Sequence, residues 1–120
     1  MTNIISLAIF TLMLAAGQLL FKRVGLSVSG LPLTKALLSL MRQPLLYAAL
    51  ALYGAATLLW IWILSRVPLS RAYPWVAFGV FIVPFLGWWL YGERVTPVFW
   101  LGVAVTVAGI LLTQYGSQGP

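Results

Sequence analysis

Apolar stretches of similar length recur along this chain, separated by short polar connections. Four of them lie at about residues 4–22, 45–64, 72–92 and 96–115, and only the lysine that closes the first is charged. Each has the roughly 20 residues that an α-helix needs to cross about 30 Å of hydrocarbon. A membrane barrel would need more chain and a period of two. The pattern predicts an all-α polytopic membrane protein, with four transmembrane helices in a single domain spanning residues 1–120.

The composition excludes several classes of function. The chain is 62% hydrophobic and 7% charged, whereas a soluble domain is about one quarter charged. It contains no cysteine, no histidine and one acidic residue, Glu93. Paired-acid, metal-hydrolase and Ser-His-Asp chemistry lack their residues, so we expect no enzyme, metal or cofactor. The net charge is +6, but the basic residues are spread over the ends of the spans and the connections between them. Membrane lipid is therefore the expected partner, and nucleic acid is not.

The first span carries a polar face. Thr11, Ala15, Gln18 and Lys22 are spaced i, i+4, i+7 and i+11, which places them on one side of a helix. Polar side chains inside a membrane turn toward a bundle or a cleft, which makes Thr11, Gln18 and Lys22 candidate substrate contacts. A second interpretation stays open: Lys22 extends to the headgroups, and Gln18 bonds a neighbouring helix.

The third span is predicted to bend. Pro74 is expected in its first turn, where a missing N–H costs little. Pro84 falls in the middle and removes the hydrogen bond to the Val80 carbonyl, which predicts a hinge at Gly79 and Pro84. At the end of this span, Glu93 is expected to form an ion pair with a basic residue at the membrane interface and to fix the helix end.

The fourth span presents small residues at helical spacing: Gly102, Thr106, Gly109 and Thr113. Such a face lets two helix backbones approach closely. It would pack within the monomer or against a second copy. We favour a dimer contact, because four short spans enclose little room for a solute.

The connections indicate an orientation. Residues 33–41, in the long link after the first span, have helical composition and are expected along the membrane interface. Five basic residues follow the first and third spans, and two lie on the opposite side: Lys22, Arg23, Lys35, Arg42 and Arg94 against Arg66 and Arg71. The excess favours cytoplasmic loops on the first side and periplasmic termini.

Several short motifs together resemble a known family. They are Ala16-Gly17-Gln18 with Lys22, Val67-Pro68, Ala72-Tyr73-Pro74, Gly92-Glu93, and the glycines Gly102 and Gly109. In their order and spacing the chain resembles the drug/metabolite transporter superfamily in its four-helix, single-repeat, EamA-like form. That form includes the small multidrug resistance proteins and the aminoarabinose-phosphoundecaprenol flippase subunits.

One departure separates these two groups. The small multidrug resistance proteins carry a glutamate in the middle of the first span, and Leu14 occupies that position here. An uncompensated cation there would cost about 3 kcal/mol or more. The resemblance is therefore nearer to the flippase subunits, which implies a polyprenyl-phosphate-linked sugar as cargo. Lys22 and Gln18 would receive its phosphate, Arg71 would do so at the opposite interface, and Tyr73 would donate a hydrogen bond.

The sequence thus predicts a flippase-like subunit of a bacterial inner membrane. It would move an anionic lipid-linked headgroup by alternating access, as a homodimer or as a heterodimer with a paralogous subunit, through an interior with positive and neutral groups but no negative one. Two alternatives remain: an exporter of small neutral or cationic metabolites, and a non-transporting subunit of a glycolipid-modification complex.

Overall fold

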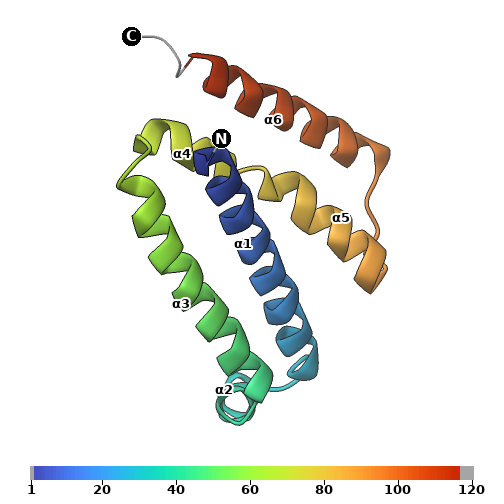
Figure 1. Ribbon diagram of the computed structural model, residues 1–120. Helices are drawn as coiled ribbons and strands as arrows, with labels where there is room; N and C mark the ends of the chain where they lie inside the picture. The colour runs from blue at the N-terminus through green and yellow to red at the C-terminus, as the bar shows by residue number, and fades with distance from the viewer. Residues whose placement is uncertain (1, 117–120) are drawn as a thin grey trace.

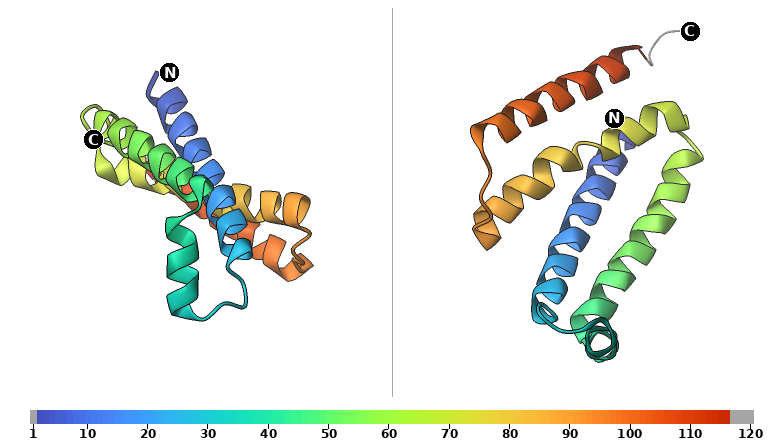
Figure 2. Two further views of the ribbon diagram at one scale, coloured as in Figure 1. Left: turned by 90° about the horizontal axis from the view of Figure 1, so that it is seen from below. Right: turned by 180° about the vertical axis from the view of Figure 1, so that it is seen from behind.

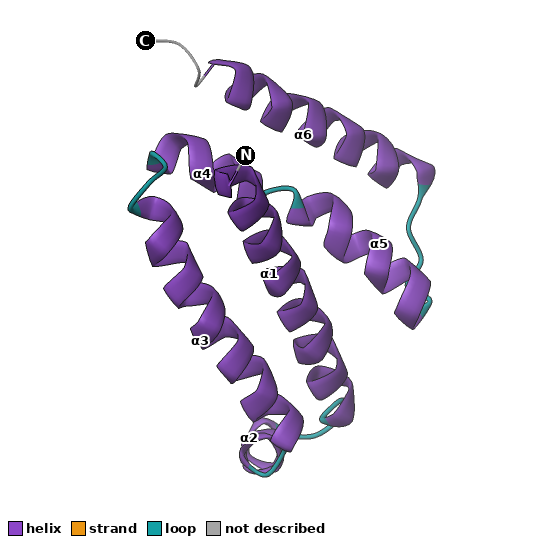
Figure 3. Ribbon diagram, viewed as in Figure 1, coloured by secondary structure: helices purple, strands orange, loops and turns teal. Residues whose placement is uncertain are grey.

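Helices form every regular element in the described part of the chain. The computed structural model describes residues 2–116. The elements are α1 (Thr2–Ser27), α2 (Leu33–Met41), α3 (Pro44–Leu64), α4 (Leu69–Val76), α5 (Gly79–Tyr91) and α6 (Pro97–Gly116) (Figures 1 and 3). Four segments are long and apolar enough to cross a membrane: Asn3–Ser27, Pro44–Leu64, Leu69–Tyr91 and Pro97–Gly116. The predicted all-α membrane fold with four spans is confirmed.

Proline and glycine mark most of the helix boundaries. Pro44 and Pro97 are the first residues of α3 and α6, where a missing N–H breaks no helical bond. The Thr96 side chain accepts a hydrogen bond from the Phe99 N–H at 3.2 Å and so caps α6. α5 ends at Gly92, whose φ of 65° is left-handed. α1 has no such stop after Lys22 and continues to Ser27.

The third span consists of two helices. Between α4 and α5, the N–H groups of Ala77 and Phe78 donate to the carbonyls of Pro74 and Trp75 at 3.1 Å each. These i to i−3 bonds make a tight 3₁₀-like turn directly before Gly79. Pro84 lies inside α5. The expectation that Pro74 occupies a first turn is wrong, because the helix begins at Leu69 and Pro74 lies inside α4.

α1 is the central helix. It packs along α3 and also contacts α4 and α5 (Figures 1 and 2). A buried apolar cluster joins its N-terminal half to α3 and α4: Leu7, Phe10, Ala56, Ile63, Val67 and Ala72. α6 lies outside this core and packs on α4 and α5. Its buried side chains include Val103 and Ile110.

α2 crosses the end of α3 and is seen end-on in Figure 1. It forms at residues 33–41, as the composition of that link predicts. Leu33, Leu38 and Met41 are 75%, 61% and 66% exposed. The Tyr47 hydroxyl donates to the Met41 carbonyl at 2.8 Å and holds α2 against α3. An apolar face left uncovered on a short helix is typical of a segment that lies in the membrane interface.

Candidate functional site

An open cleft of about 920 Å³ lies between the C-terminal half of α1, α5, and the connection from α5 to α6. This size is within the range of small-molecule sites. Its walls are apolar near Val83 and Pro84. Its polar lining comes from both sides: Gln18, Lys22, Ser29, Glu93, Arg94 and Thr96. The cleft therefore combines an apolar wall with several charged and hydrogen-bonding groups.

An ion pair crosses this cleft. The Lys22 Nζ atom of α1 lies 2.9 Å from Glu93 Oε2, just after α5. The two side chains are 44% and 45% exposed, so both can be reached from the cleft. The sequence predicts positive and neutral groups in the interior, and the structure adds the one carboxylate of the chain to them. The expectation that no negative group lines the path is therefore wrong.

Two glycines place the Glu93 carboxylate in the cleft. The left-handed Gly92 turns the chain back, and the N–H groups of Gly92 and Glu93 both donate to the Gly87 carbonyl. A Cβ atom added at Gly87 would lie 2.8 Å from Glu93 Oε1. Gly87 is buried, and its missing side chain is the space that the carboxylate occupies. A larger residue would push the carboxylate aside.

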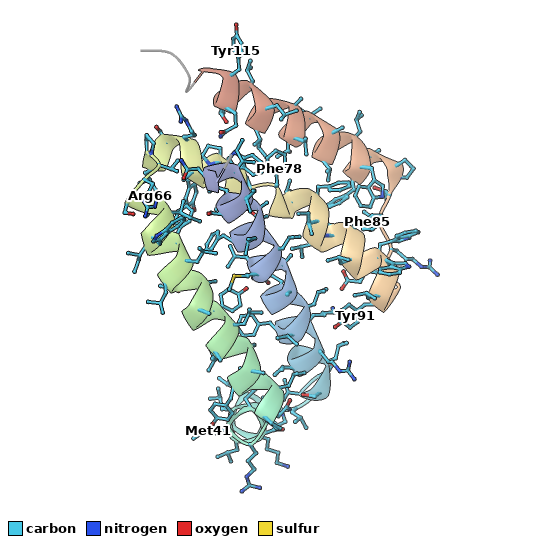
Figure 4. The ribbon with its side chains drawn as sticks, viewed as in Figure 1. Met41, Arg66, Phe78, Phe85, Tyr91 and Tyr115 are labelled. Carbon is cyan, nitrogen blue, oxygen red and sulfur yellow. The ribbon has the colours of Figure 1, made fainter. Side chains whose placement is uncertain are left out.

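Tyrosines join α1 to its neighbours around the cleft. The Gln18 side-chain amide donates to the Tyr53 hydroxyl of α3 at 2.7 Å, and the Tyr53 ring stacks on Phe21 with centroids 5.0 Å apart. The Tyr91 hydroxyl of α5 donates to the Leu19 carbonyl at 3.0 Å. Tyr91 is labelled in Figure 4, beside the lower half of α1. Gln18 therefore bonds a neighbouring helix and lines the cleft as well.

The other predicted contacts lie elsewhere. Thr11 is buried, donates to the Leu7 carbonyl at 2.8 Å, and borders a separate apolar pocket of about 340 Å³ beside Trp75 and Phe78. Tyr73 is 66% exposed on α4. The backbone carbonyl of Arg71, also on α4, accepts a hydrogen bond from Gln114 at 2.9 Å. α4 lies toward the opposite end of α1 from the cleft (Figure 1). The structure brings together Gln18, Lys22 and Glu93, whereas Thr11, Arg71 and Tyr73 lie away from the cleft.

The small-residue face of α6 points away from the monomer. Gly102, Thr106, Gly109 and Thr113 are all exposed, while Val103 and Ile110 face the other helices. The interpretation that this face packs within the monomer is therefore wrong. Its role as a dimer contact stays a prediction.

Sequence reasoning missed Tyr53 as the hydrogen-bond partner of Gln18, and it missed four residues that line the cleft: Gly87, Tyr91, Arg94 and Thr96. Tyr53 and Tyr91 are hydroxyl-bearing side chains in otherwise apolar spans, and this polarity is the signal that could have identified them. Gly87 differs from the other glycines only through its packing, which the sequence does not display.

Four membrane-length helices, with an open cleft between the first, third and fourth of them, are typical of an integral membrane protein of the transporter class. Residues 1–115 match the EamA-like transporter family, and the chain belongs to this family. It is 33% identical over 110 residues to a probable 4-amino-4-deoxy-L-arabinose-phosphoundecaprenol flippase subunit ArnE of Aeromonas hydrophila, covering 92% of this chain and 95% of that protein.

Proteins with the same description in other bacteria are also similar over shorter regions. The one from Yersinia pseudotuberculosis is 42% identical over 62 residues, covering 52% of this chain and 54% of that protein. The one from Salmonella paratyphi B is 37% identical over 73 residues, covering 59% of this chain and 66% of that protein. No solved structure matches the chain significantly.

Proposed function

We propose that this protein is a flippase-like transporter subunit that moves the headgroup of a polyprenyl-phosphate-linked sugar across a bacterial inner membrane. The observation that carries the proposal is the open cleft with Gln18, Lys22, Glu93 and Arg94 in its lining. The hydrocarbon tail of such a lipid stays in the bilayer during transport, so only the phosphate and the sugar need a polar path. The similarity to flippase subunits over nearly the whole chain supports the same cargo class.

The charges of the cleft favour a phosphate. Lys22 and Arg94 contribute two positive charges, and Glu93 contributes one negative charge. Lysine and arginine make charge-assisted hydrogen bonds to phosphate oxygens, and these are about twice as strong as neutral ones. A cationic drug is a poorer fit, because the Glu93 carboxylate already has Lys22 as its counter-ion at 2.9 Å. We therefore place the phosphate at Lys22 and Arg94.

The interrupted third span supplies the moving part of the proposed mechanism. α5 bears Gly87 and the Glu93 turn, and it meets α4 at the tight turn before Gly79. A tilt of α5 about Gly79 and Pro84 would close the cleft on α1 and open the opposite side. Arg71 and Tyr73, at that opposite side, would then receive the headgroup. The exposed small-residue face of α6 would hold a second copy or a paralogous subunit.

A reconstituted lipid-translocation assay tests this function. Liposomes containing the protein, alone or with its paralogous subunit, are loaded with a fluorescent polyprenyl-phosphate sugar. A quencher that cannot cross the membrane then reports how much label has changed leaflet. We expect Lys22→Ala to slow translocation by roughly tenfold to a hundredfold, the equivalent of a lost hydrogen bond to a charged group. Lys35→Ala is the matched control, because Lys35 lies on α2.

The proposal fails if neither preparation moves the labelled lipid. It also fails if Lys22→Ala translocates the lipid as fast as Lys35→Ala does.

A further inference from the structure

The Lys22–Glu93 pair is placed to meet a cargo as well as to join two helices. About half of each side chain is exposed to the cleft. Exposed ion pairs contribute little to stability, so such a pair opens easily. A second interaction also joins α1 to α5, the hydrogen bond from the Tyr91 hydroxyl to the Leu19 carbonyl. The two helices therefore remain connected when the pair opens.

The local structure holds the carboxylate at a defined place. The left-handed turn at Gly92 and the absent side chain at Gly87 both determine where Glu93 lies. A salt bridge on a solvated face needs no such arrangement, since long side chains find each other from many backbone positions. A carboxylate directed into a cleft beside an ammonium group presents two opposite charges to anything that enters.

We infer that Glu93 makes this cleft selective for an amino-sugar phosphate, a headgroup with one positive and one negative charge. This inference rests on the proposed function. On binding, the Lys22–Glu93 pair opens, the Lys22 ammonium binds the phosphodiester, and the Glu93 carboxylate binds the sugar ammonium. The flippase subunits to which this chain is similar are themselves described with an amino-deoxy sugar phosphate as their cargo.

Charge pairing explains why the neutral sugar is a worse cargo. An amino-sugar phosphate gives Lys22 and Glu93 one new partner each, the phosphate for Lys22 beside Arg94 and the ammonium for Glu93. A phosphate with an uncharged sugar gives Glu93 no new partner. The amino sugar therefore makes one charge-assisted contact that the neutral sugar cannot make. Selectivity comes from this second ion pair.

Two lipids that differ in one group test this inference. Each is a fluorescent polyprenyl-phosphate sugar, one with an amino group and one with a hydroxyl at the same carbon, and both are offered to the reconstituted protein. We expect the amino lipid to move roughly tenfold faster or more, and Glu93→Gln to bring the two rates together, since one hydrogen bond between charged groups is lost. Glu93→Asp should restore part of the preference.

A charge-reversed variant distinguishes recognition of the cargo from an ion pair that only joins the two helices. Lys22→Glu combined with Glu93→Lys keeps an ion pair between α1 and the end of α5. If the pair only joins helices, this variant transports with the native preference. If each charge binds one group of the cargo, the preference for the amino lipid is lost, because the lipid tail fixes the side of the cleft at which the phosphate enters. Circular dichroism of each purified variant confirms that it is folded before rates are compared.

The outcomes distinguish the two proposals. If the native protein moves both lipids equally well, selectivity by Glu93 is refuted and the flippase function stands. Retention of the amino preference by Glu93→Gln, or by the charge-reversed variant, refutes it equally. If the native protein moves neither lipid, the proposed function itself is refuted, and the inference falls with it.

Discussion

The ring of Tyr53 fills the space that a side chain at Gly17 would need. A Cβ atom built on Gly17 would overlap Tyr53 Cε2 and would lie 2.9 Å from Cζ. Carbon atoms in contact are normally about 3.5–4.0 Å apart, so in Gly17→Ala the ring has to move by about 1 Å. The ring also stacks on Phe21, and its hydroxyl accepts the hydrogen bond from Gln18. Movement of the ring disturbs both of these contacts.

The size of this effect follows from three contributions. Overpacking of a filled site costs about 1–3 kcal/mol. A hydrogen bond between membrane helices contributes about 0.6 kcal/mol, and weakening the bond from Gln18 adds up to that amount. Alanine is better than glycine within a helix by about 1 kcal/mol, which offsets part of the loss. We therefore expect Gly17→Ala to be destabilised by up to about 2.5 kcal/mol.

The matched control is Gly54→Ala, in the middle of α3. A Cβ atom there has no described atom within 4 Å, so only the helix preference remains and the variant should gain stability. Unfolding of both variants by SDS in mixed micelles, followed by tryptophan fluorescence, gives the free energies. The Gly17→Ala penalty should largely disappear in a Tyr53→Ala background. Equal stability of the two glycine variants, or an unchanged penalty without the Tyr53 ring, would refute the packing described here.

Three further changes probe the cleft, the hinge and the outer face. Gly87→Ala should lower the preference for the amino lipid to nearly the level of the Glu93→Gln variant. It should cost little stability, because the added Cβ atom displaces only the flexible end of Glu93. The two-lipid assay measures the preference, with Gly54→Ala as control. Pro84→Ala restores a donor for the Val80 carbonyl, so it should raise unfolding stability by up to about 3 kcal/mol and slow translocation severalfold; unchanged transport would argue against the hinge. Gly109→Leu should weaken subunit association about tenfold or more, about 1.4 kcal/mol, in cross-linking at graded dilution, and Ala104→Leu, on the opposite side of α6, should not.

Local physics accounts for the features that the sequence predicted well. Whether a segment spans a membrane depends on its own length and apolarity, so the four spans can be recognised residue by residue. Pro44 at the start of α3 and Gly92 directly after α5 set these helix boundaries through the backbone constraints of proline and glycine. The expected helix at residues 33–41 follows from composition in the same way.

The contacts of the cleft depend on how distant helices pack, and this is why sequence reasoning missed most of them. Glu93 has seven basic residues as conceivable partners, and only the approach of α5 to α1 selects Lys22. The polar face of α1 is a second example. Thr11 and Lys22 share it by spacing, but α4 and the buried cluster cover its first half, and the cleft opens only along the second.

The position of the Glu93 carboxylate also affects the transport cycle of a carrier of this kind. Alternating access requires the empty cleft and the loaded cleft both to change sides, and an unpaired charge would slow either change. In the empty state Lys22 and Glu93 neutralise each other at 2.9 Å. With an amino-sugar phosphate bound, each of them has a new partner, so the loaded state is also balanced. A phosphate with a neutral sugar balances only one of the two, and the change of side is then slower than with the amino sugar. The same ion pair therefore accounts for return of the empty carrier and for rejection of the wrong cargo.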